Sequence, residues 1–198
     1  MMESYIKQEL IVLNHSNQDL TFSVGTVNLK KEELIKYWDR DFINSTLSKI
    51  ENHNHKMLFK FLWMSGVRIT EAVSLRKRDI DFDNFLMEVR WLKSRKYQKR
   101  ILPIHPLLRD LLQLYSANFK ADDRIFSMSR QRAWQLSKKY FGDKPHRFRH
   151  SFAVNWLLCD GDMIILHKIL GHSKIQTTME YLKIVPSDQG KELIKIQF

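Results

Sequence analysis

Five polar side chains, spread over more than half of the chain, place a strong requirement on its fold. They are Arg68, His146, Arg149, His172 and Tyr181, and no cluster of carboxylates accompanies them. Arginine stays charged at any working pH and presents a planar fork of donors that matches phosphate oxygens. If these groups act together, the chain must fold so that two guanidinium groups and a phenol, far apart in the sequence, converge in one pocket.

The residue types in this set also bear on cofactors. Carboxylates hold Mg²⁺ in most sites of phosphoryl transfer. A site built from fixed arginine cations indicates metal-free chemistry on a phosphodiester, so we expect neither a metal ion nor another cofactor. His53 and His55 have a spacing that metal sites use, but no Cys or carboxylate stands at a convincing spacing from them, so they do not change this expectation.

The charge balance favours an anionic partner. Lys and Arg total 33 against 22 Asp and Glu, which gives a net charge of +11 over 198 residues. Such an excess favours nucleic acid, because binding releases counterions from the phosphate backbone. The alternative is a basic surface that serves only solubility.

Composition predicts a cytoplasmic globular protein of one ordinary domain. Its 43% hydrophobic content is sufficient for a core, which excludes wholesale disorder. Cys159 is the only cysteine, so an intrachain disulfide is excluded and a reducing compartment fits. There is no long apolar run and no leader pattern, so we expect no contact with a membrane.

The pattern of apolar residues predicts a mainly helical α+β domain with one small antiparallel sheet. Strand-like segments at 85–92 and 100–104 flank a basic stretch, residues 93–99, which we interpret as the tip of a hairpin. Residues 1–28 alternate weakly and indicate an extended arm or a strand pair. Helices are predicted, in chain order, over residues 29–37, 42–50, 56–64, 70–76, 107–115, 130–139, 148–158, 163–170 and 175–182.

Three segments resemble the boxes of the tyrosine recombinase (phage integrase) family. Residues 66–75, GVRITEAVSL, resemble its first arginine box, and residues 146–153, HRFRHSFA, resemble its H-x-x-R box. Residues 170–181, LGHSKIQTTMEY, resemble the segment that holds its last histidine and its nucleophile. The resemblance covers about residues 30–185 and implies the fold of that family's catalytic domain.

The resemblance also implies a function and roles for individual residues. It implies a site-specific DNA recombinase of the integrase, invertase or resolvase type, which cleaves and rejoins DNA through a 3′-phosphotyrosyl link without ATP or metal. Tyr181 would be the nucleophile, and Arg68 and Arg149 would hold the two non-bridging oxygens of the scissile phosphate. His172 would add a hydrogen bond to one of these oxygens, and His146 would accept or return the tyrosine proton.

The basic stretch leaves one assignment open. The resemblance implies that Lys93 protonates the departing 5′ oxygen, but the stretch from Lys93 to Pro103 is longer than the family pattern. Lys96 is therefore a competitor and Lys99 a lesser one, and all three could instead contact phosphates only. We expect DNA contacts from Arg95, Lys96, Lys99, Arg100 and Arg147.

Three further residues are expected to support the site without taking part in the chemistry. We expect His150 to support the loop of the second arginine and not to carry a proton. Glu71 and Asp79 are expected to order the surroundings of Arg68 through salt bridges.

The resemblance begins near residue 30, which leaves no room for the helical core-binding domain that usually precedes the catalytic domain. We therefore expect a short form with an N-terminal arm or extension (1–28), a catalytic domain (29–185) and a C-terminal tail (186–198) that docks on a neighbouring protomer. The expected partner is double-stranded DNA with paired inverted-repeat half-sites, bound by a homodimer or homotetramer.

Two alternatives share this fold: a type IB topoisomerase-like enzyme that relaxes DNA, and a catalytically idle DNA-binding protein. In each case we expect a nucleoid-associated protein of prokaryotic, viral or plasmid origin.

Overall fold

The structure, a computed structural model, describes residues 35–93 and 96–184, and their side chains apart from those of residues 92, 93, 96 and 97. The expected arm (1–28) and tail (186–198) lie outside these ranges. No described helix combines the length and the apolar character needed to cross a bilayer.

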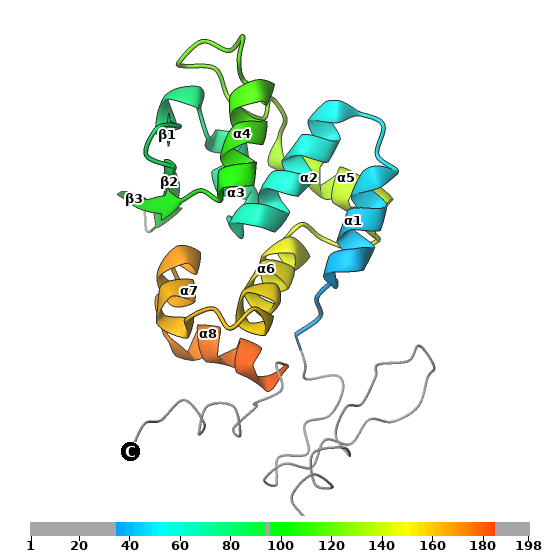
Figure 1. Ribbon diagram of the computed structural model, residues 1–198, viewed down its shortest axis with the longest axis vertical. Helices are drawn as coiled ribbons and strands as arrows, with labels where there is room; N and C mark the ends of the chain where they lie inside the picture. The colour runs from blue at the N-terminus through cyan, green and yellow to red at the C-terminus, as the bar shows by residue number, and fades with distance from the viewer. Residues whose placement is uncertain (1–34, 94–95, 185–198) are drawn as a thin grey trace, which may run out of the picture. The chain divides into compact units, whose positions relative to one another are not determined.

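Helices dominate the described residues, and one small sheet interrupts them (Figure 1). Strands β1 (Ile80–Asp81), β2 (Leu86–Lys93) and β3 (Lys96–Pro103) form an antiparallel sheet in that order. The mainly helical α+β class expected from the sequence is thereby confirmed. The helices are α1 (Arg40–Ser48), α2 (His53–Ser65), α3 (Ile69–Ser74), α4 (Pro106–Tyr115), α5 (Arg130–Phe141), α6 (His146–Leu158), α7 (Met163–Leu170) and α8 (Gln176–Met179), with 3₁₀ turns η2 (Lys77–Asp79) and η3 (Glu180–Lys183).

The hairpin is longer than expected. Pairing of β2 with β3 runs from Leu86 opposite Pro103 to Lys93 opposite Lys96, so most of the basic stretch expected at the tip belongs to a strand. The acid Glu88 explains how this stretch is accommodated. One of its carboxylate oxygens lies 2.8 Å from Arg90 on the same strand and the other 2.8 Å from Lys99 on β3. Cross-strand ion pairs of this kind stabilise a two-stranded ladder.

The helix predicted over residues 29–37 is not present where the structure describes that segment, because residues 35–39 have no helical backbone. Long-range contacts hold this segment in place. The Trp38 amide donates to Ser151 Oγ at 2.8 Å, and the indole is buried. The Asp39 carboxylate accepts the amide hydrogen at the start of α1 at 2.7 Å, which places the helix N-terminus after it.

The packing of α2 against α6 brings together the two arginine segments (Figure 1). Phe59 of α2 stacks on Phe148 of α6, with 5.4 Å between ring centroids, and both rings are fully buried. Aromatic stacking of this kind adds about 1 kcal/mol to the burial of the two rings. Because Arg68 follows α2 and Arg149 lies next to Phe148, this core contact places both arginines on the same side of the domain.

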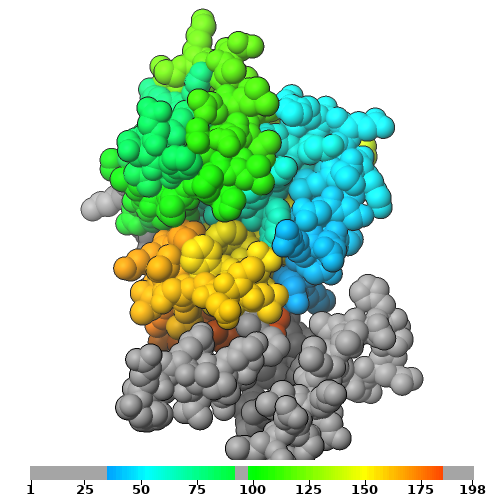
Figure 2. All heavy atoms as spheres, viewed as in Figure 1, coloured from blue at the N-terminus to red at the C-terminus, as the bar shows by residue number. Residues whose placement is uncertain are grey.

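A second group of buried side chains holds α7 and the end of the described chain against α6. Figure 2 shows α6 and α7, in yellow and orange, side by side on one face of the molecule. Tyr181 belongs to this group and is only 2% exposed. The members are Ala153, Val154, Leu157, Leu166, Leu170 and Tyr181.

Gly66 offers a test of the close approach between α2 and α6. It adopts φ +63°, and a Cβ added there would come within 2.4 Å of the Phe152 ring. We expect Gly66→Ala to lower the free energy of unfolding by about 3 kcal/mol, of which about 1 kcal/mol is backbone strain and the rest overpacking. Gly142 is a matched control with φ +74° and nothing within 4 Å, so Gly142→Ala should cost only about 1 kcal/mol. Urea unfolding measures both changes, and equal losses would contradict the packing described.

Candidate active site

Arg149 is the buried centre of the site. It is 1% exposed, and its Nη1 donates to the Gly66 carbonyl at 3.0 Å while its Nη2 donates to the Leu170 carbonyl. These carbonyls lie at the ends of α2 and α7, where helices leave acceptors unpaired. Arg68 follows the first helix and His172 follows the second. One guanidinium thus holds together three segments on which the sequence places candidate residues.

The electrostatics around Arg149 favour an anion. Burial, and then the charge of Arg68, lower the pKa of Arg149 to about 9. The guanidinium is therefore charged at pH 7, although burial disfavours that charge. The ends of two helices carry only partial negative charge. Its buried Nε also has no hydrogen-bond partner in the part of the chain that the structure describes. The positive charge of Arg149 is therefore only partly compensated within the described residues.

Arg68 is held from behind by a buried carboxylate. Its amide and its Nη1 donate to the two oxygens of Glu71, at 2.8 and 3.0 Å. The Glu71 side chain is fully buried, whereas that of Arg68 is 33% exposed. The prediction that Glu71 orders Arg68 agrees with this geometry. Asp79 does not contribute as predicted, because its carboxylate pairs with Arg90 at 3.1 Å.

Arg100 has a role other than the DNA contact predicted for it. Its Nη1 and Nη2 donate to both oxygens of Glu71, at 2.8 and 3.0 Å, and its Nε donates to the Ile169 carbonyl at 3.1 Å. The ring of Trp91 lies 5.0 Å from the guanidinium carbon. All three nitrogens are therefore engaged within the protein, and the side chain is only 11% exposed. Arg100 links β3 to Glu71 and to the end of α7.

The structure describes the side chains of two other residues predicted to contact DNA, Lys99 and Arg147. Lys99 is 72% exposed and pairs with Glu88. Arg147 pairs with Asp143, and its guanidinium lies over the Trp38 ring, 5.2 Å from the centroid. Arg95 lies outside the described residues, as do the side chains of Lys93 and Lys96.

Tyr181 contacts His150, and not His146 as the predicted roles require. The Tyr181 hydroxyl lies 2.9 Å from His150 Nδ1. The His146 ring packs edge-on against His150, with 4.6 Å between centroids. The His172 ring lies nearly parallel to that of Tyr181 at 6.4 Å, and its Nδ1 is 2.9 Å from the hydroxyl of Thr178. His150, expected to support the arginine loop, is thus also in contact with the Tyr181 hydroxyl.

The histidines of the site are neutral at pH 7. Burial is the main cause and lowers the pKa of His146 and His150 to about 4 and that of His172 to about 3. The charge of Arg149 acts in the same direction on all three. A neutral imidazole has one donor and one acceptor nitrogen. Burial raises the pKa of Tyr181 more than Arg149 and Arg68 lower it, so the phenol keeps its proton and needs an acceptor to become a nucleophile.

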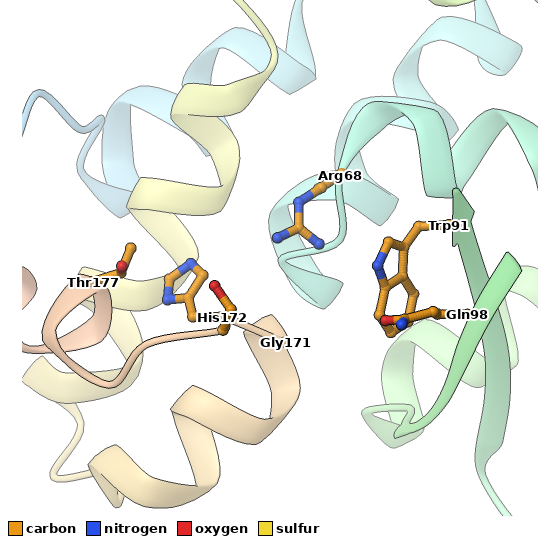
Figure 3. Close-up of a pocket in the computed structure, with 7 residues that line it drawn as sticks. Arg68, Trp91, Gln98, Gly171, His172 and Thr177 are labelled. Atoms are coloured by element: carbon orange, nitrogen blue, oxygen red, sulfur yellow. The ribbon is translucent and has the colours of Figure 1, made fainter. Parts of the chain in front are cut away.

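An open cavity of about 560 Å³ lies between the hairpin and the loop that carries His172. Figure 3 shows Arg68 pointing into the space between His172 on one side and Trp91 and Gln98 on the other. Trp91 and Gln98 face each other across β2 and β3, and the sequence did not single them out. The described residues contain no group of three or more His, Cys, Asp or Glu side chains placed to hold a metal ion. The lining residues are Arg68, Trp91, Gln98, Gly171, His172, Ser173 and Thr177.

Comparison with known protein families identifies the family of this chain. The family described as the phage integrase family matches residues 32–187. The chain belongs to the phage integrase family. Tyrosine recombinase XerA of Thermococcus onnurineus is 31% identical over 171 residues, which are 77% of this chain and 60% of that protein. XerA of Saccharolobus solfataricus is 30% identical over 166 residues, 81% of this chain and 56% of that protein. The chain thus spans less than two thirds of the length of these relatives.

Solved structures of this family share the fold. A crystal structure of XerA recombinase superposes with a TM-score of 0.63 at 21% identity, over 88% of this chain and 68% of that chain. The catalytic domain of bacteriophage HP1 integrase superposes with a TM-score of 0.64 at 21% identity, over 80% of this chain and 94% of that domain. XerH recombinase bound to a palindromic substrate gives 0.61 at 19% identity, over 81% and 52%. The described residues therefore have the fold of the tyrosine recombinase catalytic domain.

Because Glu71 forms buried ion pairs, we expect that replacing it with a neutral residue lowers the free energy of unfolding by an amount that depends on pH. Burial alone would raise the Glu71 pKa, but hydrogen bonds and charge from Arg100 and Arg68 outweigh it and lower the pKa. The stability from this charge is therefore present above the unfolded-state pKa of about 4.5 and lost as pH falls through the folded-state value. We expect Glu71→Gln to lower the free energy of unfolding at pH 7 by about 3 kcal/mol, because two arginines lose their buried partner.

Urea unfolding at pH 7 and pH 3 measures this effect, and the gap between Glu71→Gln and the wild type should narrow at pH 3. The matched control is Glu88→Gln, which removes a carboxylate that also pairs with two basic side chains but at the surface. That change should leave unfolding nearly unaltered. Similar effects of the two substitutions would show that the Glu71 pairs do not contribute as described.

Proposed function

We propose that this protein is a site-specific DNA recombinase that breaks and rejoins DNA through a covalent link between Tyr181 and a 3′ phosphate. The observation that carries the proposal is the bonding of buried Arg149 to the ends of α2 and α7. It gathers Arg68, His172 and Tyr181 around one positively charged site. Membership of the phage integrase family and relatives named tyrosine recombinases support the same conclusion.

In the proposed reaction the Tyr181 hydroxyl attacks phosphorus. Arg68 and Arg149 stabilise the negative charge that builds on the non-bridging oxygens in the transition state. Two fixed cations can do for these oxygens what Mg²⁺ does in carboxylate-based sites, so we propose that the reaction needs no metal. The phosphotyrosyl link keeps the energy of the broken bond, so rejoining needs no ATP. A hairpin lysine, Lys93 or Lys96, is proposed to protonate the leaving 5′ oxygen.

The contacts of His172 are compatible with the tautomer that its proposed role needs. Thr178 Oγ1 lies 2.9 Å from His172 Nδ1 and 3.1 Å from His167 Nδ1. The threonine hydroxyl has one proton, so it can donate to His172 while it accepts from His167. Neutral His172 then carries its proton on Nε2, and this donor can hydrogen bond to a phosphate oxygen in the cavity. We propose that Thr178 sets this tautomer.

Double-stranded DNA is the proposed substrate, and more than one protein copy would act on it. The basic charge of the chain supports a polyanionic partner. The XerH structure contains a palindromic substrate, which suggests inverted half-sites here, and paired half-sites require paired protomers. We propose that residues 186–198 dock between such protomers, and that the protein works at the nucleoid.

Replacing the proposed nucleophile tests the chemistry. The assay uses a nicked duplex that carries the inverted repeats flanking the protein's own gene, and it detects an adduct of protein and DNA that resists SDS. We expect the wild type to form the adduct equally with and without EDTA, and Tyr181→Phe to form none. Tyr140→Phe is the control, because Tyr140 bonds to His55 at 3.1 Å and should not affect the adduct. An adduct from Tyr181→Phe, or a reaction that EDTA stops, would refute the mechanism.

Arg68 is the better of the two arginines for a test of charge stabilisation, because its side chain is partly exposed whereas Arg149 holds the fold together. We expect Arg68→Ala to slow adduct formation by about 10²–10³-fold, the usual effect of losing one donor to a developing oxyanion. Arg78→Ala removes a half-exposed arginine that pairs with Asp122 and should leave the rate unchanged. Thermal unfolding confirms that both variants are folded. Equal rates for the two variants would argue against the role of Arg68.

A further inference from the structure

Among the described side chains, His150 is hydrogen bonded to the Tyr181 hydroxyl, with 2.9 Å between Nδ1 and the phenol oxygen. It lies in α6 directly after Arg149, and η3, which carries Tyr181, packs against that helix. Tyr181 is 2% exposed, and His150 is partly buried. A buried phenol is therefore paired with an imidazole in the same core that holds the second arginine.

The other groups near the phenol are less suited to take its proton. His146 is exposed, and its described ring contact is with His150, which it meets edge-on. Nδ1 of His172 is occupied by Thr178. Arg68 and Arg149 are donors only, and the buried carboxylate of Glu71 is bonded to Arg68 and Arg100.

We propose that His150, and not His146, accepts the proton of Tyr181 during DNA cleavage and returns it during rejoining. This inference rests on the recombinase function proposed above. As the phenol oxygen forms its bond to phosphorus, its proton passes to Nδ1 of His150, which requires the tautomer with hydrogen on Nε2. The bond between phosphorus and the 5′ oxygen breaks, and that oxygen takes a proton from the hairpin lysine. Rejoining reverses each transfer, and His150 protonates the departing Tyr181.

The charges around this pair keep His150 unprotonated before cleavage and favour return of the proton during rejoining. Burial, then His146 and Arg149, lower the pKa of His150 to about 4, so the imidazole is neutral and free to accept a proton at pH 7. Once protonated, it lies among other cations and gives the proton back readily, which favours rejoining. The titratable and charged groups that face His150 are His146, Arg147 and Arg149 of α6, Lys144 before it and Tyr181 of η3, and those that face Tyr181 are Arg68, Arg149, His150 and His172.

The test uses the nicked duplex with sulfur in place of the bridging 5′ oxygen at the scissile phosphate. A thiolate leaves without being protonated, so loss of the leaving-group acid has little effect, whereas loss of the proton acceptor still slows the reaction. His150→Asn keeps an oxygen acceptor near the position of Nδ1 but cannot hold a proton. We expect adduct formation by this variant to be about 10²–10⁴-fold slower at pH 7. Its rate should also rise about tenfold per pH unit between pH 6 and 9, because the phenol must then ionise by itself. The wild-type rate should be nearly flat over this range.

Two further substitutions separate a proton acceptor from a structural residue. His146→Asn should keep the flat pH profile, whatever its rate. His55→Asn makes the same change at a second bond between a histidine Nδ1 and a tyrosine, with Tyr140 at 3.1 Å, and should react at the wild-type rate. A flat profile for His150→Asn, or a rising profile for His146→Asn, would overturn the proposal.

A measurement without DNA examines the same hydrogen bond. In the full chain with ¹⁵N-labelled histidine, long-range nitrogen–proton spectra should show His150 Nδ1 without a proton, with the resonance assigned by its loss in His150→Asn. A protonated Nδ1 would overturn the role of His150 and leave the recombinase function intact. Failure of the wild type to form any adduct would overturn that function, and the proposal with it.

Discussion

A single buried cation organises the site, and the rest of the domain depends on its bonds. Arg149 donates to the last carbonyls of two helices that belong to different parts of the chain, α2 and α7. Carbonyls at helix ends carry partial negative charge, so the arginine stabilises both helix ends while they stabilise its charge. The same two helix ends lead into Arg68 and into His172. Folding and assembly of the site are therefore one event, because the core cannot close around α6 without bringing these residues together.

Around this centre, burial favours the neutral form of the histidines and of the phenol. It removes charge from the histidines and retains the proton on the phenol, which leaves the arginines as the cations of the site. Glu71 does not neutralise Arg149 but is bonded to Arg68 and Arg100. Three arginines and one carboxylate leave the described site with a net positive charge.

The sequence was sufficient for most of the helices, although not for the one predicted over residues 29–37, because local patterns specify helices. Motif spacing was also sufficient to single out the two arginines. Helix α7 follows its predicted bounds, and Arg68 and Arg149 converge as required. Which side chains bond to one another could not be predicted, because these bonds join segments that are distant in the chain. Arg100 was one basic residue among several until Glu71 was placed beside it. His150 and His146 share a helix face, and only the position of η3 shows which of them contacts the phenol.

The bonds of Arg100 also have a mechanical consequence. The Arg100 guanidinium connects β3 to Glu71, which holds Arg68, and to the carbonyl of Ile169. Gly171 follows shortly after, and a Cβ added there would lie 3.3 Å from Arg100. The hairpin and the His172 loop therefore cannot shift independently. Any force that bends the hairpin is transmitted through Arg100 to both walls of the cavity at once.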